Sequence, residues 1–285
     1  MGIESTNLAG RVCLVTGANS GIGKSTAHAL ARLNATVVMV CRDRNRAEPV
    51  RDEIATATGN QNVELMMCDL SSQADIRRFA ADFLNTHNRL DVLINNAGVV
   101  VRQRSLTEDG IESTFAVNHL GYFLLTNLLL DLLKKSAPAR IVNVSSAAHA
   151  YGKIDFDNLQ GERKYGGFSA YANSKLANVL FTYELARRLD GPGVTANCLH
   201  PGGVATGLFR NLPKPIEALI KLVTISPNKG AETSVYLASS PAVEGVTGKY
   251  FARKRETRTS NASYNEEAAR RLWEVSSELS GLERR

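Results

Sequence analysis

Short apolar runs alternate along the chain with longer segments whose apolar positions recur at helical spacing. Between the first runs, this spacing predicts helices over Gly21–Leu33, Arg44–Thr58 and Ser72–His87. Strands as apolar as these runs are buried on both faces, which is typical of a parallel sheet covered by helices on each side. The predicted strands are Val12–Thr16, Thr36–Val40, Val63–Met67, Val92–Asn95, Ile141–Ser145 and Val194–Leu199.

The alternation predicts a single α/β domain over residues 1–285, because no linker rich in Pro, Gly or Ser divides the chain. Ligands of such sheets bind beyond the carboxyl ends of the strands. The segment at about 204–226 follows the sixth strand. It is expected to be either a mobile lid over a substrate or a helix that covers the core, and both interpretations stay open. A C-terminal helix is predicted at about 265–281.

The stretch GANSGIGKST, which follows the first strand, fits two phosphate-binding patterns. Ala18–Ser25 resembles the P-loop of an ATPase, with Ala in place of the first Gly, whereas Thr16–Gly23 is a dinucleotide loop. The P-loop also needs a later strand that ends in an Asp for magnesium, and Val92–Asn95 continues into Asn-Ala-Gly. The dinucleotide loop is therefore favoured, in a Rossmann-type doubly wound parallel sheet. Its expected cofactor contacts are Gly17, Asn19, Ser20, Gly21, Ile22 and Gly23.

Tyr171 and Lys175 stand four residues apart in a predicted helix and so share one face. An ammonium beside a phenol stabilises the phenolate and lowers its pKa. Tyr171 is then able to exchange a proton with an alcohol or carbonyl oxygen during hydride transfer. Taken alone, the pair is more typical of an exposed helix surface, and the other motifs of the chain reverse that preference.

Five motifs follow one another along the chain: Thr16–Gly23, Asn95–Gly98, Asn118, Ser145-Ser146 and Tyr171–Lys175. Motifs in this order resemble the short-chain dehydrogenase/reductase family, and the resemblance covers nearly the whole chain. Between Ser145 and Leu189 the sequence is also similar to the retinol dehydrogenase-like branch, which oxidises or reduces lipophilic alcohols and carbonyls.

The resemblance implies a role for each of these positions. Ser146 would hold the substrate oxygen, Tyr171 would transfer the proton, and Lys175 would assist it. Asn118 would bend its helix and hold a water that relays protons to the Lys, whereas the adjacent His119 is expected to be packing. The remaining cofactor contacts implied are Asp69, Leu70, Asn96, Ala97, Gly98, Tyr171, Lys175, Pro201, Gly202, Val204 and Thr206.

The end of the second predicted strand indicates which nicotinamide cofactor is bound. The acid that would bond a ribose 2′-hydroxyl is replaced by Cys41, and Arg42 follows. A guanidinium suits the 2′-phosphate of NADP, so NADP (NADPH) is expected rather than NAD. Asp43, one position later, leaves open that a carboxylate faces the ribose.

Charge and cysteine content indicate which binding partners and which cellular location to expect. The net charge is +6, but basic and acidic residues alternate through most of the chain, so no nucleic acid partner is expected. The four cysteines lack any C-x-x-C pairing, which predicts core thiols in a reducing, cytoplasmic setting and no metal site. No basic-then-apolar segment precedes the first strand, so no transmembrane anchor is expected, and peripheral contact with a membrane stays open.

The most apolar predicted helix, about Phe115–Leu133, is interrupted by polar residues and suits a helix packed on a sheet or on a neighbouring subunit. The family resemblance implies a homodimer or homotetramer formed through this helix and through Ser169–Leu189. The expected function is an NADP(H)-dependent oxidoreductase acting on a small lipophilic substrate. The alternative is a non-enzymatic NADP-binding sensor or scaffold protein, which would not need Ser146, Tyr171 and Lys175 together.

Overall fold

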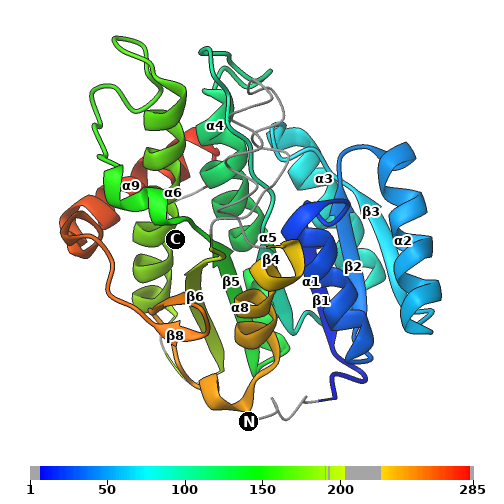
Figure 1. Ribbon diagram of the computed structural model, residues 1–285. Coiled ribbons are helices and arrows are strands. Elements are labelled where there is room, and N and C mark those ends of the chain that lie inside the picture. Colours follow the sequence, from blue (N-terminus) through cyan, green and yellow to red (C-terminus); the bar gives the residue numbers. More distant parts are fainter. Residues whose placement is uncertain (1–6, 190, 192, 203–225, 283–285) are drawn as a thin grey trace.

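An eight-stranded sheet in the order β3-β2-β1-β4-β5-β6-β7-β8 forms the centre of the molecule (Figure 1). The computed structural model describes residues 7–189, 191, 193–202 and 226–282. All neighbouring strands run parallel except β7 and β8. The strands are β1 (Val12–Thr16), β2 (Thr36–Cys41), β3 (Val63–Met67), β4 (Val92–Asn95), β5 (Ala139–Val144), β6 (Val194–His200), β7 (Tyr250–Ala252) and β8 (Arg255–Glu256).

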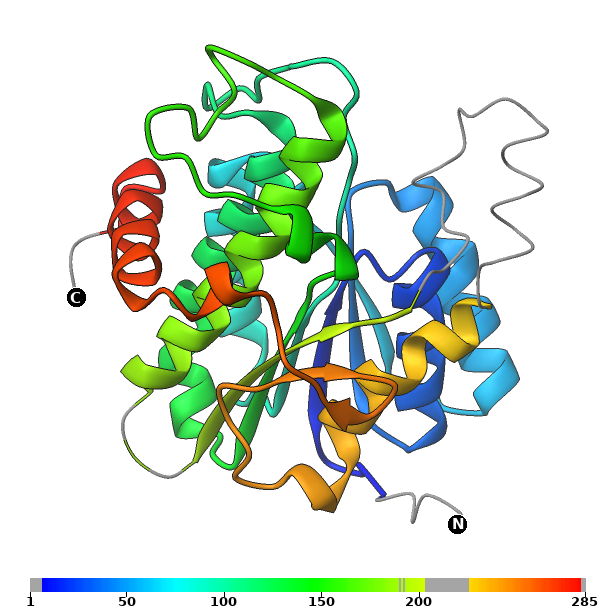
Figure 2. The same ribbon diagram turned by 60° about the vertical axis from the view of Figure 1, so that its left-hand side comes forward.

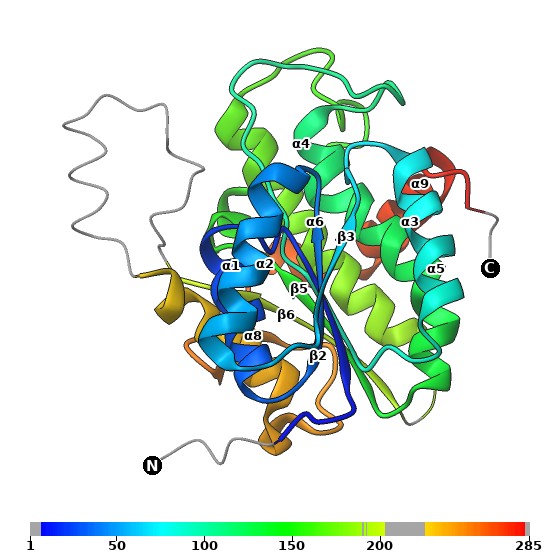
Figure 3. The same ribbon diagram turned by 90° about the vertical axis from the view of Figure 1, so that its right-hand side faces the viewer.

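Helices cover both faces of the sheet (Figure 3). Because successive strand residues point to opposite faces, Leu14 packs in one core while Cys13 and Val15 pack in the other. On one face lie α1 (Gly21–Arg32), α2 (Arg44–Thr58) and α8 (Pro227–Ser239), and on the other lie α3 (Gln73–Thr86), α5 (Gly121–Lys135) and α6 (Gly167–Arg188). The predicted single-domain, doubly wound α/β fold is confirmed.

The sequence analysis missed the last two strands. The basic cluster at residues 252–255 is the tight turn of the β7–β8 hairpin, in which Arg253 and Lys254 have φ of 51° and 63°. Strand β5 also differs from its prediction, since it begins at Ala139 and ends at Val144, one residue before Ser145. Ser145 still donates its backbone N–H to Leu199 O, so the ladder continues one step beyond the strand.

Helix α9 (Glu266–Leu279) forms an outer layer over α5 and α6 (Figure 2). The Trp273 ring lies 4.9 Å from that of Phe123 and 5.8 Å from that of Phe181, and the Arg188 guanidinium lies 4.4 Å from the indole. The predicted C-terminal helix is therefore present. It occupies part of the α5 and α6 surface that was expected to meet a neighbouring subunit.

Short helical segments complete the described chain. They are α4 (Ser113–Phe115), the π-helix η1 (Ala116–Leu120) and the 3-10 helices η2 (Ala147–Tyr151), η4 (Pro241–Val243) and η5 (Asn261–Tyr264). Within the described ranges, one continuous helical stretch, Ser113–Lys135, has the length and apolar composition to cross a membrane. Since 78% of its most apolar window is buried inside the fold, this is weak evidence for a span.

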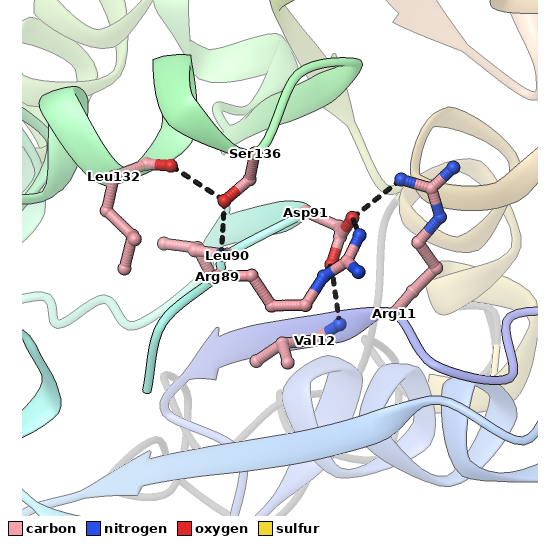
Figure 4. A network of polar contacts seen from close by, with 7 residues as sticks. All are labelled: Arg11, Val12, Arg89, Leu90, Asp91, Leu132 and Ser136. Atoms are coloured by element: carbon pink, nitrogen blue, oxygen red, sulfur yellow. Dashed lines mark hydrogen bonds and ion pairs between the residues drawn. The ribbon is translucent and has the colours of Figure 1, made fainter. Parts of the chain in front are cut away.

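A buried carboxylate connects residues at the amino end of the sheet, where β1 and β4 begin (Figure 4). Asp91 accepts hydrogen bonds from the Arg11 guanidinium at 2.6 Å, from Arg89 Nε at 2.8 Å and from the Val12 backbone N–H at 2.8 Å. Burial alone would raise the pKa of Asp91, but these donors outweigh it and hold the pKa below its usual value. The stabilisation is therefore present at neutral pH and is lost as the pH falls through that lowered pKa.

Candidate active site

A tight glycine loop joins β1 to α1 at the carboxyl end of the sheet. Gly17 and Gly21 have φ of 66° and 55°, a region that glycine adopts without strain. A Cβ on Gly23 would collide with Gly17 O, and one on Gly17 would lie 2.9 Å from the Cα of Ala97. The hydroxyl of Ser20, the N-cap residue, makes no capping bond to α1. The first N–H groups of the helix are therefore available to a pyrophosphate, so this cradle fits a dinucleotide.

The two residues that made the P-loop pattern plausible are engaged elsewhere. Lys24 Nζ lies 2.7 Å from Glu53 Oε2 in an ion pair with α2. The Ser25 hydroxyl donates to Asn228 Oδ1 on α8 at 2.8 Å. Both side chains therefore serve packing between helices, which agrees with the dinucleotide interpretation of the loop.

Asn96 supports the glycine loop from the neighbouring strand. Its amide Nδ2 donates to Thr16 O at 2.8 Å, and the Thr16 hydroxyl accepts the backbone N–H groups of Asn96 and Ala97 at 2.9 and 3.0 Å. The side chain of Asn96 and the backbone N–H of Ala97 are thus used within the protein, and Ala97 O accepts from the Tyr122 hydroxyl at 2.6 Å. The turn can approach a cofactor closely at Gly98, which has no side chain. Asn95, which precedes the turn, is fully buried inside the sheet.

The end of β2 separates the roles of three adjacent residues. The Cys41 thiol is buried, and this burial raises its pKa to about 11, although the nearby backbone N–H groups of Ala18 and Asn19 oppose the rise. Asp43 caps helix α2 by accepting from the Arg46 N–H at 3.2 Å. Arg42 between them is exposed. The Arg42 guanidinium is therefore the accessible charged group at this strand end, whereas the Asp43 carboxylate is used as the cap of α2.

Asp69 and Leu70 follow β3 and differ in exposure. Asp69 Oδ1 accepts from the Ser71 N–H at 2.9 Å and from its hydroxyl at 2.7 Å. Leu70 is buried, and its side chain belongs to the core. A cavity of about 410 Å³ opens beside Asp69, where the family resemblance places the adenine, and it is lined by Asp69, Ser72, Ala74, Asp75, Arg78 and Glu108.

Helix α6 brings Tyr171 and Lys175 beside the end of β5. The Tyr171 hydroxyl faces the side chain of Ser146, the residue that caps η2, closely enough for Ser146 to lower the pKa of the phenol. Lys175 Nζ lies 5.6 Å from the centre of the Tyr171 ring and donates to Val144 O at 3.0 Å. The other serine, Ser145, donates its hydroxyl to Lys175 O at 2.8 Å. The structure thus places the Ser146 hydroxyl at the tyrosine and uses Ser145 to attach the strand to the helix.

The expected fall in the Tyr171 pKa is wrong for the protein as described here. Burial raises the pKa of Tyr171, and the hydrogen bond from Ser146 only partly opposes this. Lys175 is itself buried, which lowers its pKa to about 7. Its ammonium bonds a backbone carbonyl and not the phenol, so it gives the phenolate little support. Tyr171 consequently carries its proton at neutral pH.

Asn118 lies in the π-helical turn η1, where the helix departs from regular geometry. Its Oδ1 accepts from the Val99 N–H at 2.7 Å, and its Nδ2 donates to Val99 O at 2.9 Å and to the Ser174 hydroxyl at 3.0 Å. A Cβ on Gly98 would lie 3.4 Å from Asn118 Oδ1. The backbone carbonyl of Asn118 accepts from Asn178 Nδ2 at 2.9 Å. Asn118 thus holds the segment after β4 against α6.

The family resemblance places Pro201 and Gly202, which follow β6, in a wall beside the nicotinamide. The structure describes only the start of this wall. Pro201 and Gly202 follow the strand, and Gly202 has a φ of 96°. Val204, Thr206 and nearly all of the expected lid at about 204–226 lie outside the described residues. Ser226, at the end of that segment, caps helix α8. No group of three or more His, Cys, Asp or Glu side chains in the described ranges is placed to hold a metal ion.

Comparisons with known proteins agree with this geometry. A family model for short chain dehydrogenases matches residues 11–217. The chain belongs to the short-chain dehydrogenase family. It is 49% identical to human retinol dehydrogenase 11 over 98% of this chain and 88% of that protein, which places it in the retinol dehydrogenase-like branch.

Solved structures show the same fold. An uncharacterised protein from Mycobacterium paratuberculosis superposes with a TM-score of 0.80 at 34% identity, over 98% of this chain and 96% of that one. The RhlG/NADP active-site complex from Pseudomonas aeruginosa superposes with a TM-score of 0.72 at 29% identity, over 88% of this chain and 97% of that one.

This short-chain dehydrogenase also contains polar residues near the site that the sequence analysis did not single out. Asn178 follows Tyr171 and Lys175 at helical spacing, and this spacing was a signal that could have found it. His149 and His200 contact the Ser146 loop and the Gly202 turn. They lie 51 residues apart in the sequence, and no local pattern joins them.

Proposed function

We propose that this short-chain dehydrogenase is an NADP(H)-dependent oxidoreductase that transfers a hydride between nicotinamide and a lipophilic alcohol or carbonyl. Retinoids, steroids and aliphatic aldehydes or ketones are the substrate types in question. The observation that carries the proposal is the juxtaposition of Ser146 and Tyr171, with Lys175 one helical turn away and its Nζ 5.6 Å from the centre of the Tyr171 ring. A sensor or scaffold protein would not need this set, so the enzymatic function is preferred.

The chain's own residues can manage the proton and orient the substrate. NADPH, when bound, would supply the hydride. Ser146 would donate a hydrogen bond to the substrate carbonyl oxygen, and Tyr171 would deliver its proton to that oxygen. Lys175 would face the nicotinamide ribose across Gly98. A Cβ atom on Gly98 would lie 3.6 Å from Lys175 Nζ.

The raised pKa of Tyr171 favours carbonyl reduction at neutral pH. The hydroxyl must be protonated to donate, and burial raises its pKa above the ordinary value of 10.0. The rate of reduction should therefore not fall through loss of this proton until the pH approaches that raised pKa. Alcohol oxidation needs the phenolate, so its rate should rise with pH over the same range.

The preference for NADP rests on the end of β2. Arg42 is exposed there, and Asp43 is used as the cap of α2, which supports a guanidinium facing a 2′-phosphate. The buried thiol of Cys41 occupies the position where an acid would bond a 2′-hydroxyl. The NADP complex of the RhlG structure, which has the same fold, is in keeping with this choice.

A lipophilic substrate is supported by two exposed aromatic rings near the catalytic tyrosine. Tyr151 is 77% exposed, Phe168 is 62% exposed, and their ring centres lie 6.1 Å apart. Phe168 precedes Tyr171 by three residues on α6, so it lies on the same side of the helix. The name of the human relative, retinol dehydrogenase 11, suggests a retinoid.

We propose a cytoplasmic location, which suits the four free and buried cysteines. A homodimer or homotetramer also stays a prediction. Because α9 covers part of α5 and α6, such an assembly would use surfaces that α9 leaves free. Peripheral contact with a membrane is untested.

The test is a reduction assay on the purified chain, followed through loss of nicotinamide absorbance. Retinaldehyde and a series of aldehydes of decreasing chain length are each offered with NADPH and with NADH. We expect turnover with NADPH and a kcat/KM that rises with substrate hydrophobicity. A preference for NADH would contradict the cofactor assignment. Equal kcat/KM along the aldehyde series would contradict the substrate class.

A further inference from the structure

One imidazole nitrogen joins two segments of the candidate active site. His200 is the last residue of β6, and its Nδ1 accepts the backbone N–H of Ala147 at 3.1 Å and that of Gly202 at 3.4 Å. Ala147 directly follows Ser146, whose side chain faces Tyr171. Gly202 belongs to the expected nicotinamide wall. The substrate-binding serine and that wall are thus fixed to the same side-chain atom.

This connection exists only while His200 is neutral. A neutral imidazole has one nitrogen that accepts a hydrogen bond, whereas both nitrogens of an imidazolium are donors. Protonation of Nδ1 would place an N–H opposite two backbone N–H groups and break both bonds. The Ser146 loop and the Gly202 turn would then lose their common partner.

His149 fastens the same loop from the other side. Its Nδ1 lies 2.7 Å from Ser146 O, so it must donate there, and its Nε2 accepts the Ser260 N–H at 3.3 Å. The Tyr250 hydroxyl lies 3.4 Å from Nδ1. These contacts require a neutral His149 with its proton on Nδ1. Two neutral imidazoles therefore hold the loop that carries Ser146.

We propose that His200 is a positioning residue of the dehydrogenase, whose neutral Nδ1 aligns Ser146 with the Gly202 turn and whose protonation releases both. This inference rests on the proposed oxidoreductase function. On this inference, His200 sets the acid limit of turnover, although it lies outside the set of Ser146, Tyr171 and Lys175.

The surroundings of His200 keep it neutral near neutral pH. Burial is the main cause that lowers its pKa from 6.5, and the nearby His149 and Arg253 lower it further. Burial likewise lowers the pKa of His149. The hydroxyls of Tyr250 and Tyr171 also lie on this side and carry no charge at neutral pH, since burial raises their pKa values further above the ordinary 10.0. The connection is therefore intact at neutral pH and is lost as the pH falls below the ordinary histidine range.

Two substitutions at His200 distinguish its role as a hydrogen-bond acceptor from its ability to be protonated. In His200→Asn, the amide Oδ1 can take the place of Nδ1 as an acceptor but cannot be protonated in this range. In His200→Phe, the ring remains and the acceptor is lost. His28→Asn is the matched control, because His28 lies about two turns along α1 from the glycine loop.

Steady-state retinaldehyde reduction with NADPH is measured for all four proteins from about pH 4 to about pH 8, a range that extends well below the ordinary histidine pKa of about 6.5. We expect His200→Phe to lower kcat about thirtyfold at neutral pH, as the loss of a buried acceptor for two N–H groups implies. His200→Asn should stay within about threefold of the wild type and lose the part of the acid fall in kcat that His200 causes, leaving only that of His149, while His28→Asn should keep the wild-type profile. An acid limb that persists unchanged in His200→Asn would overturn the inference.

A second measurement does not depend on turnover. Titration of the isotope-labelled protein without substrate follows the amide signals of Ala147 and Gly202 by NMR. We expect both to shift with one common midpoint in the wild type and to stay constant in His200→Asn. Shifts in the wild type without any dehydrogenase activity would contradict the proposed function alone. Signals that do not respond to the His200 titration would contradict the positioning role alone.

Discussion

The two faces of the sheet bury polar side chains in different ways. Under α1 and α8, the hydroxyls of Thr26 and Ser234 are buried and, within the described part of the chain, have no hydrogen-bond partner. Under α5 and α6, buried polar groups are bonded to one another in a chain that crosses several elements, and Asn95 Oδ1 is the atom of this chain that has no partner within the described residues. This polar chain contains Thr126, Asn95, Asn143, Thr182, Asn178, His119 and Ser276.

The difference follows the location of the proposed catalytic residues. Asn178, near the end of this polar chain, holds the backbone carbonyl of Asn118, and α6 also carries Tyr171 and Lys175. Bonded polar groups in a core favour one arrangement of the elements that carry them, since an unpaired group there is costly. The face under α1 and α8 presents the glycine loop mainly through its backbone. Its core can therefore be apolar, while the catalytic face needs directional contacts.

The largest effect expected is on the catalytic face. Tyr171→Phe removes the proton donor, and general acid catalysis of this kind contributes about a hundredfold to ten-thousandfold in rate. We expect kcat to fall by at least about a thousandfold with NADPH affinity nearly unchanged, measured by steady-state kinetics and by titration calorimetry. Asn127→Ala, on the same face and away from the tyrosine, is the control. Turnover of Tyr171→Phe at the wild-type rate would show that another group supplies the proton.

A smaller effect is expected on the other face, at the end of β2. Arg42→Asp exchanges a charged contact with a 2′-phosphate for a carboxylate that can accept from a 2′-hydroxyl. The ratio of NADPH to NADH affinity should fall roughly tenfold to hundredfold, as determined by fluorescence titration. Arg44→Asp, two positions along, is the charge-matched control. An unchanged ratio would assign the selection to another residue.

The third prediction breaks the polar chain under α6. Thr182 is fully buried, donates to Asn178 O at 2.7 Å and accepts from Asn143 Nδ2 at 3.0 Å. Thr182→Val keeps the shape and leaves the Asn143 amide without this acceptor. We expect the free energy of unfolding to fall by about 2 kcal/mol, read from the midpoint of chemical denaturation. No change in that midpoint would mean that the chain contributes nothing to stability.

The sequence predicted the parts of this arrangement that are encoded locally. The glycine loop, the Tyr171 and Lys175 pair and the strand–helix alternation all depend on neighbouring residues, and the fold they imply is confirmed. The polar chain depends on contacts such as that of His119 with Ser276, which are 157 residues apart, and no local spacing reveals it. For the same reason, the C-terminal helix was predicted but its position over α5 and α6 was not. The expected pKa of Tyr171 was wrong because it ignored the burial of both partners.

The smallest effect, and one of opposite sign, is expected at Thr26 on α1. Its hydroxyl is buried and lacks a partner within the described residues, so the folded state carries the cost of its lost hydration. Thr26→Val keeps the shape and removes that cost, and it should raise the free energy of unfolding by about 1 kcal/mol in the denaturation assay used for Thr182→Val. Because the two substitutions are chemically identical, their difference reports only on whether the buried hydroxyl is bonded. A loss of stability at Thr26 equal to that at Thr182 would mean that the hydroxyl under α1 also has a partner, such as a buried water, and that the two faces do not differ in this respect.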